Sequence, residues 1–293
     1  MSASAPRAPQ AHLIESAIGQ HLFVADGSRL FDADADTFGA FASAMAGERT
    51  DEVVALLARL GLAAAPLIDD TPLPNPRIHA FSLAVAQKCN LGCTYCYAQQ
   101  GEFGAPAKNM SLAQAERAVD LLINGAEPGA RLNLSFLGGE PLVNRPVLQA
   151  ATLRASELAK QRDLPITFSI TTNGTLLTEA DADFFETHGF AVTISLDGLR
   201  EAHDALRPYK GGRGSFDTVM RNVAPLLSRQ RRMQVSARVT VTPKNLELRT
   251  TLDAFIAAGF HSVGFSPMLS APSGNGEMQA DDLEIMLGEM IEC

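Results

Sequence analysis

Short apolar segments alternate with segments of helical periodicity from residue 78 to the end of the chain. The apolar segments are rich in β-branched residues, as buried strands of a parallel sheet are. Between them, apolar positions recur every three to four residues, which predicts helices. Six successive strand–helix units predict a parallel sheet with helices on its faces, and right-handed crossovers would curl it into a barrel or partial barrel. The strands are expected at 80–86, 132–137, 166–172, 191–196, 234–241 and 262–267, and the helices at 111–124, 146–161, 178–188, 215–228, 246–258 and 280–291.

The first part of the chain has a different pattern. A hairpin-like alternation surrounds a turn at 26–28, and helical periodicity follows it, with Gly61 as the C-cap of the second helix. We therefore expect a small α+β unit over residues 13–68. Its strands are expected at 21–25 and 29–31, and its helices at 36–46 and 50–60.

A proline-rich segment at 69–77 separates the two patterns. It holds three prolines between Pro72 and Pro76, and such spacers are extended and mark domain boundaries. The second domain is therefore expected over 78–293. Residues 1–12 are rich in Ala, Pro and Ser and lack the apolar run of a signal peptide, so we expect a disordered start.

Composition narrows the function classes. The chain has 293 residues, 46% of them apolar, and a net charge of −9, so it has no general attraction for phosphate backbones and nucleic acid is not an expected partner. No stretch approaches the roughly 20 apolar residues that span a bilayer, so no membrane partner is expected and we predict a soluble, cytoplasmic protein. A disulfide framework would spread the cysteines, whereas three of the four fall within eight residues.

Those three cysteines, Cys89, Cys93 and Cys96, follow the first predicted strand of the second domain. Thiolates are the usual ligands of iron–sulfur clusters, and three of them can hold three irons of a [4Fe–4S] cube and leave the fourth open. Gly92 lets the short loop fold tightly. Structural zinc is the main alternative, but it normally needs four ligands, and His79 lies before the strand. A further alternative is three buried structural cysteines.

A glycine-rich turn follows the second strand. Gly138 and Gly139 expose backbone groups, and Glu140 adds a carboxylate, which together suit an ammonium group. The alternative is a plain loop, and only the position one strand after the cysteine triad favours the functional interpretation.

Short polar side chains lie at the ends of the next two strands. Thr172 and Asn173 belong to a Thr-Thr-Asn-Gly segment, and Ser195 and Asp197 to a Ser-Leu-Asp-Gly segment. Such groups can hydrogen-bond a ribose or a carboxylate. They are equally common as turn formers and helix caps, so both interpretations stay open.

Two residues on the last strands complete the candidate set. Arg238 lies on an otherwise apolar strand and needs an acceptor, either an internal carboxylate or a ligand carboxylate. Met268 follows the sixth strand, where a methionine is more often a core residue than a cofactor contact.

Together these motifs resemble the radical S-adenosylmethionine superfamily. The resemblance is carried by Cys-x₃-Cys-x₂-Cys with the aromatic Tyr95 before the last cysteine, and by the Gly-Gly-Glu-Pro, Thr-Thr-Asn-Gly and Ser-Leu-Asp-Gly segments in that order. His203-Asp-Ala-Leu-Arg207 followed by Gly-Ser-Phe-Asp217 narrows it to peptide and protein maturases, which include thioether-forming maturases and anaerobic sulfatase-maturing enzymes. The resemblance covers about 78–291.

The resemblance implies a fold and a set of roles. The fold is a partial (β/α)₆ TIM-like barrel. The three cysteines ligate the cluster, the cofactor's amine and carboxylate chelate the open iron, and the 138–140 turn receives the amine. Ser195, together with Arg207 or Arg238, contacts the carboxylate or ribose, and Met268 lines the adenine site. The other implied cofactor-binding positions are Tyr95, Thr172, Asn173 and Asp197.

The chemistry implied by the resemblance is reductive cleavage of S-adenosylmethionine, which gives methionine and a 5′-deoxyadenosyl radical that takes hydrogen from the substrate. An external one-electron reductant, such as flavodoxin or ferredoxin, is implied as a partner. The expected output is a thioether or similar cross-link in a ribosomally made peptide (RiPP). The alternatives are oxidation of a sulfatase residue to formylglycine, and a leader-binding protein whose barrel is idle.

The unit at 13–68 resembles part of a winged-helix-like module that captures leader peptides by β-strand addition. A structural cap on the barrel is the alternative. Related maturases usually continue into a cysteine-rich domain, so we expect that this chain is either truncated at Cys293 or lacks that domain. Cys293 itself is expected to be a free thiol.

Overall fold

The computed structural model describes residues 11–16, 18–25, 29–62, 77–96, 98, 107–272 and 274–293. Two compact units make up the chain, with the division between Pro76 and Arg77. The turn predicted at 26–28 and all of the predicted linker except Arg77 lie outside the described residues.

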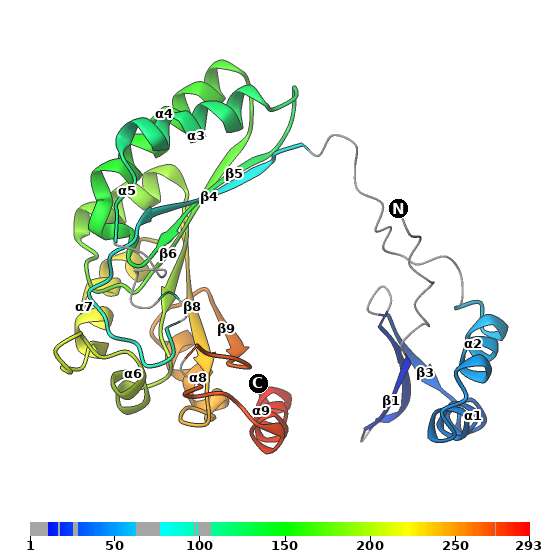
Figure 1. Ribbon diagram of the computed structural model, residues 1–293. Coiled ribbons are helices and arrows are strands. Elements are labelled where there is room, and N and C mark those ends of the chain that lie inside the picture. The colour runs from blue at the N-terminus through cyan, green and yellow to red at the C-terminus, as the bar shows by residue number, and fades with distance from the viewer. Residues whose placement is uncertain are drawn as a thin grey trace. The chain divides into compact units, whose positions relative to one another are not determined.

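The N-terminal unit is a three-stranded antiparallel sheet followed by two helices (Figure 1). One strand was not expected. It begins at Ala11 and pairs with the second strand, so the prediction of disorder is wrong for Ala11 and His12. Residues 1–10 lie outside the described part of the chain. The elements are β1 (Ala11–Ser16), β2 (Gly19–Val24), β3 (Arg29–Ala33), α1 (Ala35–Ala46) and α2 (Thr50–Arg59).

This unit has a hydrophobic core of its own. Leu22 and Val24 of the sheet pack with Phe41 of α1 and Leu57 of α2, and all four side chains are almost completely buried. Asp34 caps α1, because its carboxylate accepts a hydrogen bond from the backbone N–H of Thr37 at 2.7 Å.

The C-terminal unit contains a six-stranded parallel sheet in the sequential order β4 to β9, with β4 and β9 at its edges. The predicted strand positions are confirmed to within one residue. The strands are β4 (Ala80–Ala86), β5 (Leu132–Gly138), β6 (Ile166–Thr172), β7 (Ala191–Ser195), β8 (Gln234–Val241) and β9 (Ser262–Pro267).

All six predicted helices of this unit are present, and the structure adds two short elements. The seven-residue helix α6 and the single 3₁₀ turn η2 were not expected, because segments this short carry no clear periodicity. The helices are α3 (Leu112–Asn124), η2 (Pro141–Asn144), α4 (Arg145–Gln161), α5 (Glu179–His188), α6 (Arg200–Leu206), α7 (Phe216–Arg229), α8 (Leu248–Ala257) and α9 (Ala280–Glu292).

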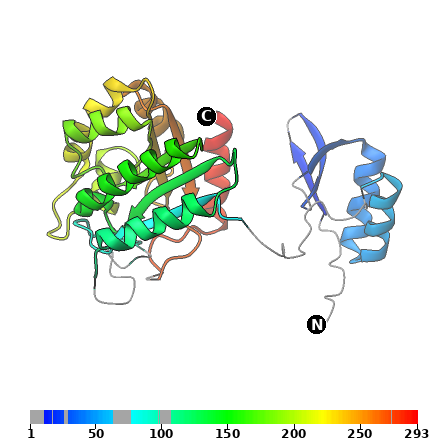
Figure 2. The ribbon, with the colours of Figure 1, turned by 90° about the horizontal axis from the view of Figure 1, so that it is seen from above.

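The two faces of the sheet differ in polarity. Alternate residues such as Leu134, Phe136 and Ile170 are buried against the helices, which lie along the outer side of the curved sheet (Figure 2). The residues between them point to the inner face and are mostly small and polar. Serines of adjacent strands pair there, as between Ser135 and Ser169, whose Oγ atoms lie 2.6 Å apart. The inner face is therefore a polar surface, and the helices that the structure describes do not give it a hydrophobic covering.

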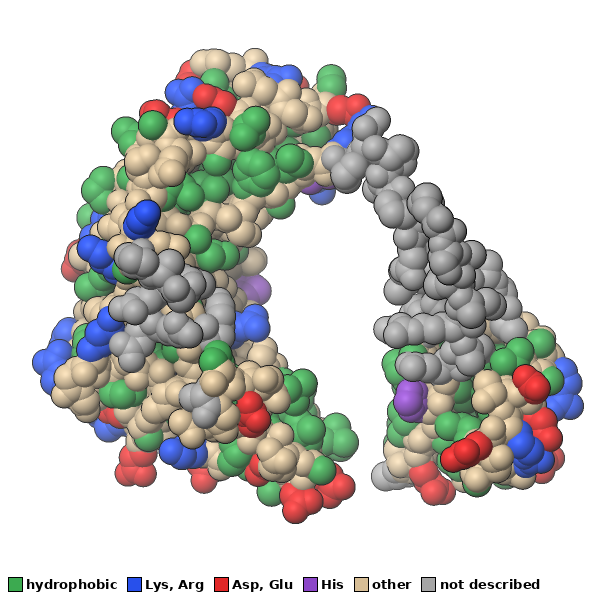
Figure 3. All heavy atoms as spheres, viewed as in Figure 1, with side chains coloured by type: hydrophobic (Ala, Val, Ile, Leu, Met, Phe, Trp, Pro, Cys, Tyr) green, Lys and Arg blue, Asp and Glu red, His purple; other side chains and the backbone are tan. Residues whose placement is uncertain are grey.

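The last helix, α9, keeps much of its surface in solvent. Apolar and acidic side chains lie together at this end of the C-terminal unit (Figure 3). Among the helices that the structure describes, none combines the length and apolar character that crossing a bilayer requires.

Candidate functional site

The candidate residues gather at the carboxyl ends of the parallel strands, the edge at which α/β folds usually carry their chemistry. The cysteine loop follows β4, the Gly-Gly-Glu turn ends β5, and the Thr-Asn and Ser-Leu-Asp segments end β6 and β7. Parallel pairing of neighbouring strands therefore brings these segments, which are far apart in sequence, to one rim.

The cysteine loop is held against the end of α6 and the segment that follows it. Gly92 donates its backbone N–H to the carbonyl of Pro208 at 2.8 Å, and Thr94 donates to the carbonyl of Leu206 at 3.0 Å. Leu91 and Tyr209 form an isolated antiparallel bridge. A loop with its own backbone partners holds its side chains in fixed positions without needing a strand or helix.

The three cysteines of the loop are half-buried thiols outside any disulfide, and hydrogen-bond donors lie beside two of them. The Sγ of Cys89 accepts from the N–H of Leu91 at 3.5 Å and from the amide of Asn173 at 3.6 Å. The Sγ of Cys93 lies 3.8 Å from Nη1 of Arg207. Burial raises the pKa of Cys93 to about 11, and the positive charge of Arg207 opposes that rise. Binding a metal would remove the thiol proton.

The donor set fits an iron–sulfur cluster. Hydrogen bonds to cysteine sulfurs and partial burial are the features with which proteins tune such clusters. Within the described ranges, no three His, Cys, Asp or Glu side chains converge as they would on a single metal ion. A cube does not require that convergence, because each thiolate binds a different iron.

Glu140 is completely buried, and its carboxylate accepts hydrogen bonds from other protein groups. It accepts from the N–H of Leu142 at 3.0 Å, from the hydroxyl of Thr172 at 2.8 Å and from the N–H of Asn173 at 2.8 Å. Burial raises the pKa of Glu140, and the hydrogen bonds from the backbone N–H groups counteract part of the increase. The carboxylate therefore ties the end of β5 to the end of β6.

The two glycines before Glu140 allow a close approach of backbones. Gly138 has φ of 146°, and a Cβ there would overlap the carbonyl oxygen of Ala86. Gly139 donates its N–H to the same carbonyl at 2.8 Å. Since the Glu140 side chain is occupied, the half-buried backbone of Gly138 and Gly139 is what this turn offers to a ligand.

Asn173 holds the cysteine loop in place, while Thr172 donates to Glu140. Besides contacting Cys89, the Asn173 amide donates to Oδ1 of Asn90 at 3.0 Å, and its own Oδ1 accepts from Thr175. Asn90 in turn donates to Oγ1 of Thr175 at 2.8 Å. Both predicted residues are buried, and their polar atoms have protein partners.

Asp197 is the centre of a second buried network, here called the Asp197 network, with Tyr95, Arg207 and Thr240. Its Oδ2 accepts from the Tyr95 hydroxyl and from Nε of Arg207, the latter at 2.8 Å. Its Oδ1 accepts from the N–H of Thr240 at 3.0 Å. The Arg207 guanidinium also lies over the Tyr95 ring, 5.5 Å from its centroid. Asp197 thus binds the loop between Cys93 and Cys96 to the end of β7.

Ser195 and Arg238 are arranged differently. They are direct neighbours across β7 and β8, on the inner face, and Gly264 of β9 faces Arg238 on its other side. Arg238 is exposed and Ser195 is half-buried. Within the part of the chain that the structure describes, neither side chain has a hydrogen-bond or ion-pair partner. Both side chains are therefore accessible, and the internal carboxylate considered as a partner of Arg238 is not found in the described chain.

Met268 lies at the end of β9 and packs in a small apolar cluster with Tyr95, Leu206 and Ala271. The structure therefore brings Met268 to the aromatic residue of the cysteine loop.

Four residues of this rim were not predicted as site residues: Asn90, Thr175, His203 and Ser215. Asn90 directly follows Cys89, and His203 begins the segment that ends at Arg207, so proximity to a motif was the available signal. His203 is fully buried, and Nδ1 accepts the N–H of Asp197 at 3.2 Å.

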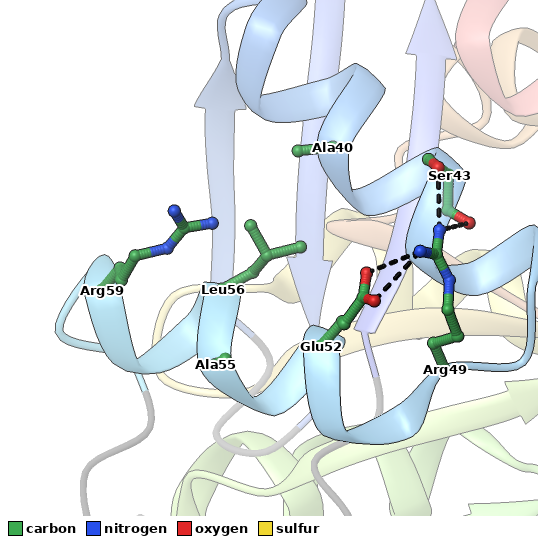
Figure 4. A pocket seen from close by; sticks show the side chains of 7 residues that line it. All are labelled: Ala40, Ser43, Arg49, Glu52, Ala55, Leu56 and Arg59. Atoms are coloured by element: carbon green, nitrogen blue, oxygen red, sulfur yellow. Dashed lines mark hydrogen bonds and ion pairs between the residues drawn. The ribbon is translucent and has the colours of Figure 1, made fainter.

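A separate groove lies on the N-terminal unit, between α1 and α2 (Figure 4). Arg49 forms one wall through its ion pair with Glu52 and its hydrogen bonds to Ser43. Arg59 forms the other wall, with Leu56 between them. None of the residues that line this groove is a sequence-predicted site residue.

Comparison with known proteins gives a family and several relatives. The family model of the radical SAM superfamily matches residues 83–255, more than half of the chain. The serine-type anaerobic sulfatase-maturating enzyme of Klebsiella aerogenes is 29% identical over 209 residues, which cover 70% of this chain and 50% of that enzyme. The cysteine-type enzyme of Clostridium novyi is 33% identical over 141 residues, 47% of this chain and 37% of that enzyme. The chain thus spans about half the length, or less, of these relatives.

Solved structures share the fold. Native anSMEcpe with bound AdoMet superposes with a TM-score of 0.62 at 23% identity, covering 73% of this chain and 59% of that chain. SuiB of Streptococcus suis superposes with a TM-score of 0.57 at 13% identity, covering 98% of this chain and 69% of that chain.

Proposed function

We propose that this chain, which belongs to the radical S-adenosylmethionine superfamily, modifies a peptide by abstracting hydrogen from it. Its cofactors are a [4Fe–4S] cluster and S-adenosylmethionine. When bound, the reduced cluster supplies the electron that cleaves S-adenosylmethionine to the hydrogen-abstracting radical. The observation that carries the proposal is the loop of three thiols at the carboxyl end of β4, which is held by its own backbone hydrogen bonds and has hydrogen-bond donors beside Cys89 and Cys93.

Cys89, Cys93 and Cys96 are the cluster ligands in this proposal, and each thiolate holds one iron. The backbone of Gly138 and Gly139 receives the amine of S-adenosylmethionine, because the neighbouring Glu140 carboxylate is already occupied. Three further residues do not touch the cofactor in this proposal but hold the cysteine loop and the glycine turn together: Thr172, Asn173 and Glu140.

Arg238 is our candidate for the cofactor's carboxylate. Of the two arginines that the sequence leaves open, Arg207 is paired with Asp197, whereas Arg238 is exposed beside Ser195 without a protein partner in the described chain. A guanidinium with free donors binds a carboxylate through two parallel hydrogen bonds. The Ser195 hydroxyl is placed for the ribose or the carboxylate, and Met268 with Tyr95 for the adenine.

The six-stranded sheet is, in this proposal, a partial TIM-like barrel with its inner face toward the reaction. Radical chemistry requires that the target C–H be held close to the cofactor and that water be kept away. The serine- and threonine-lined inner face offers hydrogen bonds to an extended peptide backbone, which would fix that geometry.

A peptide substrate has support from the comparisons. The curated relatives are named as sulfatase-maturating enzymes, and anSMEcpe has been solved with the Cp18Cys peptide bound. We propose that the N-terminal unit is a winged-helix-like module that recognises a leader peptide. The exposed edge of its three-stranded sheet would pair with the peptide's backbone. The electron would come from an external flavodoxin or ferredoxin in the cytoplasm.

Two reaction products are considered for the modified peptide, a cross-link and formylglycine. The N-terminal unit, which we propose binds a leader peptide, favours a cross-link such as a thioether in a ribosomal peptide. The sulfatase-maturating relatives favour formylglycine instead. Mass spectrometry of a co-expressed cysteine-rich peptide separates them, because a thioether keeps the sulfur, whereas formylglycine is an aldehyde that reacts with a hydrazide.

The decisive experiment is anaerobic reconstitution with iron and sulfide, followed by reduction and detection of 5′-deoxyadenosine. We expect 5′-deoxyadenosine from the wild-type chain and none from Cys93→Ala. Cys293→Ala is the matched control, because Cys293 is exposed and lies outside the loop, and it should behave as wild type. An intact cluster without 5′-deoxyadenosine would instead favour an idle barrel that only binds a leader peptide.

A further inference from the structure

Arg207 lies against a predicted cluster ligand, Cys93. Its side chain is 12% exposed, and its Nη1 lies 3.8 Å from Sγ of Cys93 while Nε donates to Asp197. Burial disfavours its charge, but Asp197, together with Tyr95 and Cys93, more than offsets burial and raises the pKa of Arg207. The positive charge of Arg207 is thus held beside the Cys93 thiol, and the Asp197 carboxylate is its counter-charge.

A relay of hydrogen bonds fixes the residue that carries this charge. Nδ1 of His203 accepts from the N–H of Asp197, and its Nε2 lies 2.9 Å from the Ser215 hydroxyl. Burial lowers the pKa of His203 to about 4, so the ring is neutral near pH 7. Since Nδ1 accepts, Nε2 carries the proton and donates to Ser215. The Ser215 hydroxyl then donates to the carbonyl of Arg207 at 2.6 Å.

A second anchor holds Ser215 itself. The carboxylate of Asp204 accepts from the N–H groups of Ser215 and Phe216, at 2.7 and 2.8 Å. A Cβ at Gly214 would overlap this carboxylate, so a larger residue there would displace the Asp204 side chain. We call the segment from His203 to Phe216 the clamp, because its hydrogen bonds hold the backbone of Arg207 in place.

We propose that Arg207 is a positioning residue that sets the reduction potential of the cluster through the Cys93 thiolate. The proposal rests on the proposed function, since it needs the cluster in place. A positive charge and an N–H donor near a cysteine sulfur stabilise the reduced, more negative cluster and raise its potential. Asp197 limits the effect, because its negative charge partly offsets the guanidinium.

The two charges therefore give opposite predictions. Arg207→Met removes the donor and the charge, so the cluster should become harder to reduce and its midpoint potential more negative. Asp197→Asn leaves the guanidinium without its counter-charge, so the midpoint potential should become more positive. Arg207→Lys keeps the charge without the fork of donors, and its potential should lie between those of Arg207→Met and wild type.

The measurement is an EPR-monitored reductive titration of the anaerobically reconstituted full chain, with iron and sulfide counted per chain. Arg154→Met is the matched control, because Arg154 pairs with Asp120 between the outer helices α3 and α4, and its potential should equal that of wild type. This readout is independent of turnover, and a purely structural role for Arg207 would not produce shifts of opposite sign.

The outcomes separate the two proposals. A wild-type chain that assembles no cluster contradicts both the proposed function and the role of Arg207. A wild-type cluster with unchanged potentials in Arg207→Met and Asp197→Asn, or with shifts of the same sign, overturns the role of Arg207 alone. If Arg207→Met does not retain iron, Asp197→Asn decides by the sign of its shift. Loss of iron from both variants overturns potential tuning in favour of a structural role.

Discussion

The rim of the sheet and its inner face use their polar side chains in opposite ways. At the rim, Glu140, Asn173 and Asp197 are buried, and their polar side-chain atoms are hydrogen-bonded within the protein. On the inner face, Ser195 and Arg238 are accessible and have no partner in the described chain. The sequence motifs do not distinguish the two groups, but the structure does. The rim residues form the frame of the site, and the inner-face residues are left for a ligand.

The physical reason lies in the cost of burial. A buried carboxylate without partners is strongly unfavourable, so Glu140 and Asp197 are tolerated only because several donors surround each of them. Those donors come from different loops, and satisfying the carboxylates therefore joins the loops. An exposed arginine needs no protein partner, because water solvates its guanidinium until a ligand binds.

The largest effect is expected at the rim, in Glu140→Ala. Removing the carboxylate leaves the donors of Leu142, Thr172 and Asn173 buried without an acceptor, which should cost about 3–5 kcal/mol of unfolding free energy. Urea unfolding of the chain measures this loss. Glu284→Ala, at an exposed position on α9, is the control and should change stability by less than about 0.5 kcal/mol. A Glu140→Ala variant as stable as the control would show that this carboxylate does not support the rim.

A different effect is expected on the inner face, in Arg238→Met. Stability should stay within about 0.5 kcal/mol of wild type, because no contact in the described chain is lost. Affinity for S-adenosylmethionine should fall by about 10- to 100-fold, the value of a charged hydrogen bond. Equilibrium binding to the reconstituted protein tests this.

Arg131→Met is the matched control for that experiment. Arg131 is exposed immediately before β5, at the opposite end of the strands, and its loss should leave affinity unchanged. Equal affinities in Arg238→Met and Arg131→Met would remove Arg238 from the cofactor site.

The smallest effect concerns pH and the clamp behind the rim. The pKa of folded His203 is about 4, below its ordinary value of 6.5, so the folded state disfavours the protonated ring. Stability from this residue is complete above the unfolded pKa and is lost as pH falls from 6.5 toward 4. Between about pH 7.5 and about pH 5.5 the loss should be about 1.3 kcal/mol. His203→Gln should remove that part of the pH dependence in thermal or urea unfolding, and an unchanged pH slope would contradict the assignment.

Much of the fold was predictable, because it depends on periodicity. The six strands of the C-terminal unit are apolar on the face that the helices cover, and their positions agree with the sequence pattern. The helix α6 was missed, since seven residues span only two turns. β1 was missed because its burial comes from pairing with β2, with only Ala11 buried, and its own sequence lacks a clear alternation.

The structure places the candidate residues at the strand ends that the sequence predicts, but the contacts of these residues were not predictable. The cysteine spacing identified the loop, and the polar motifs identified the correct strand ends. Which carboxylate is occupied and which arginine is paired depends on contacts between residues such as Arg207 and Asp197 across three loops. Local sequence does not encode those contacts, so the choice between Arg207 and Arg238 needed the structure.

The central claim is that three thiolates hold a cluster whose open iron receives S-adenosylmethionine at the inner face. Electron–nuclear double resonance on the reduced cluster, with S-adenosylmethionine labelled at its methionyl nitrogen and carboxylate, tests it directly. We predict hyperfine coupling of both labels to the cluster in the wild-type chain. An intact, reduced cluster with bound S-adenosylmethionine and no coupling to either label would contradict the account.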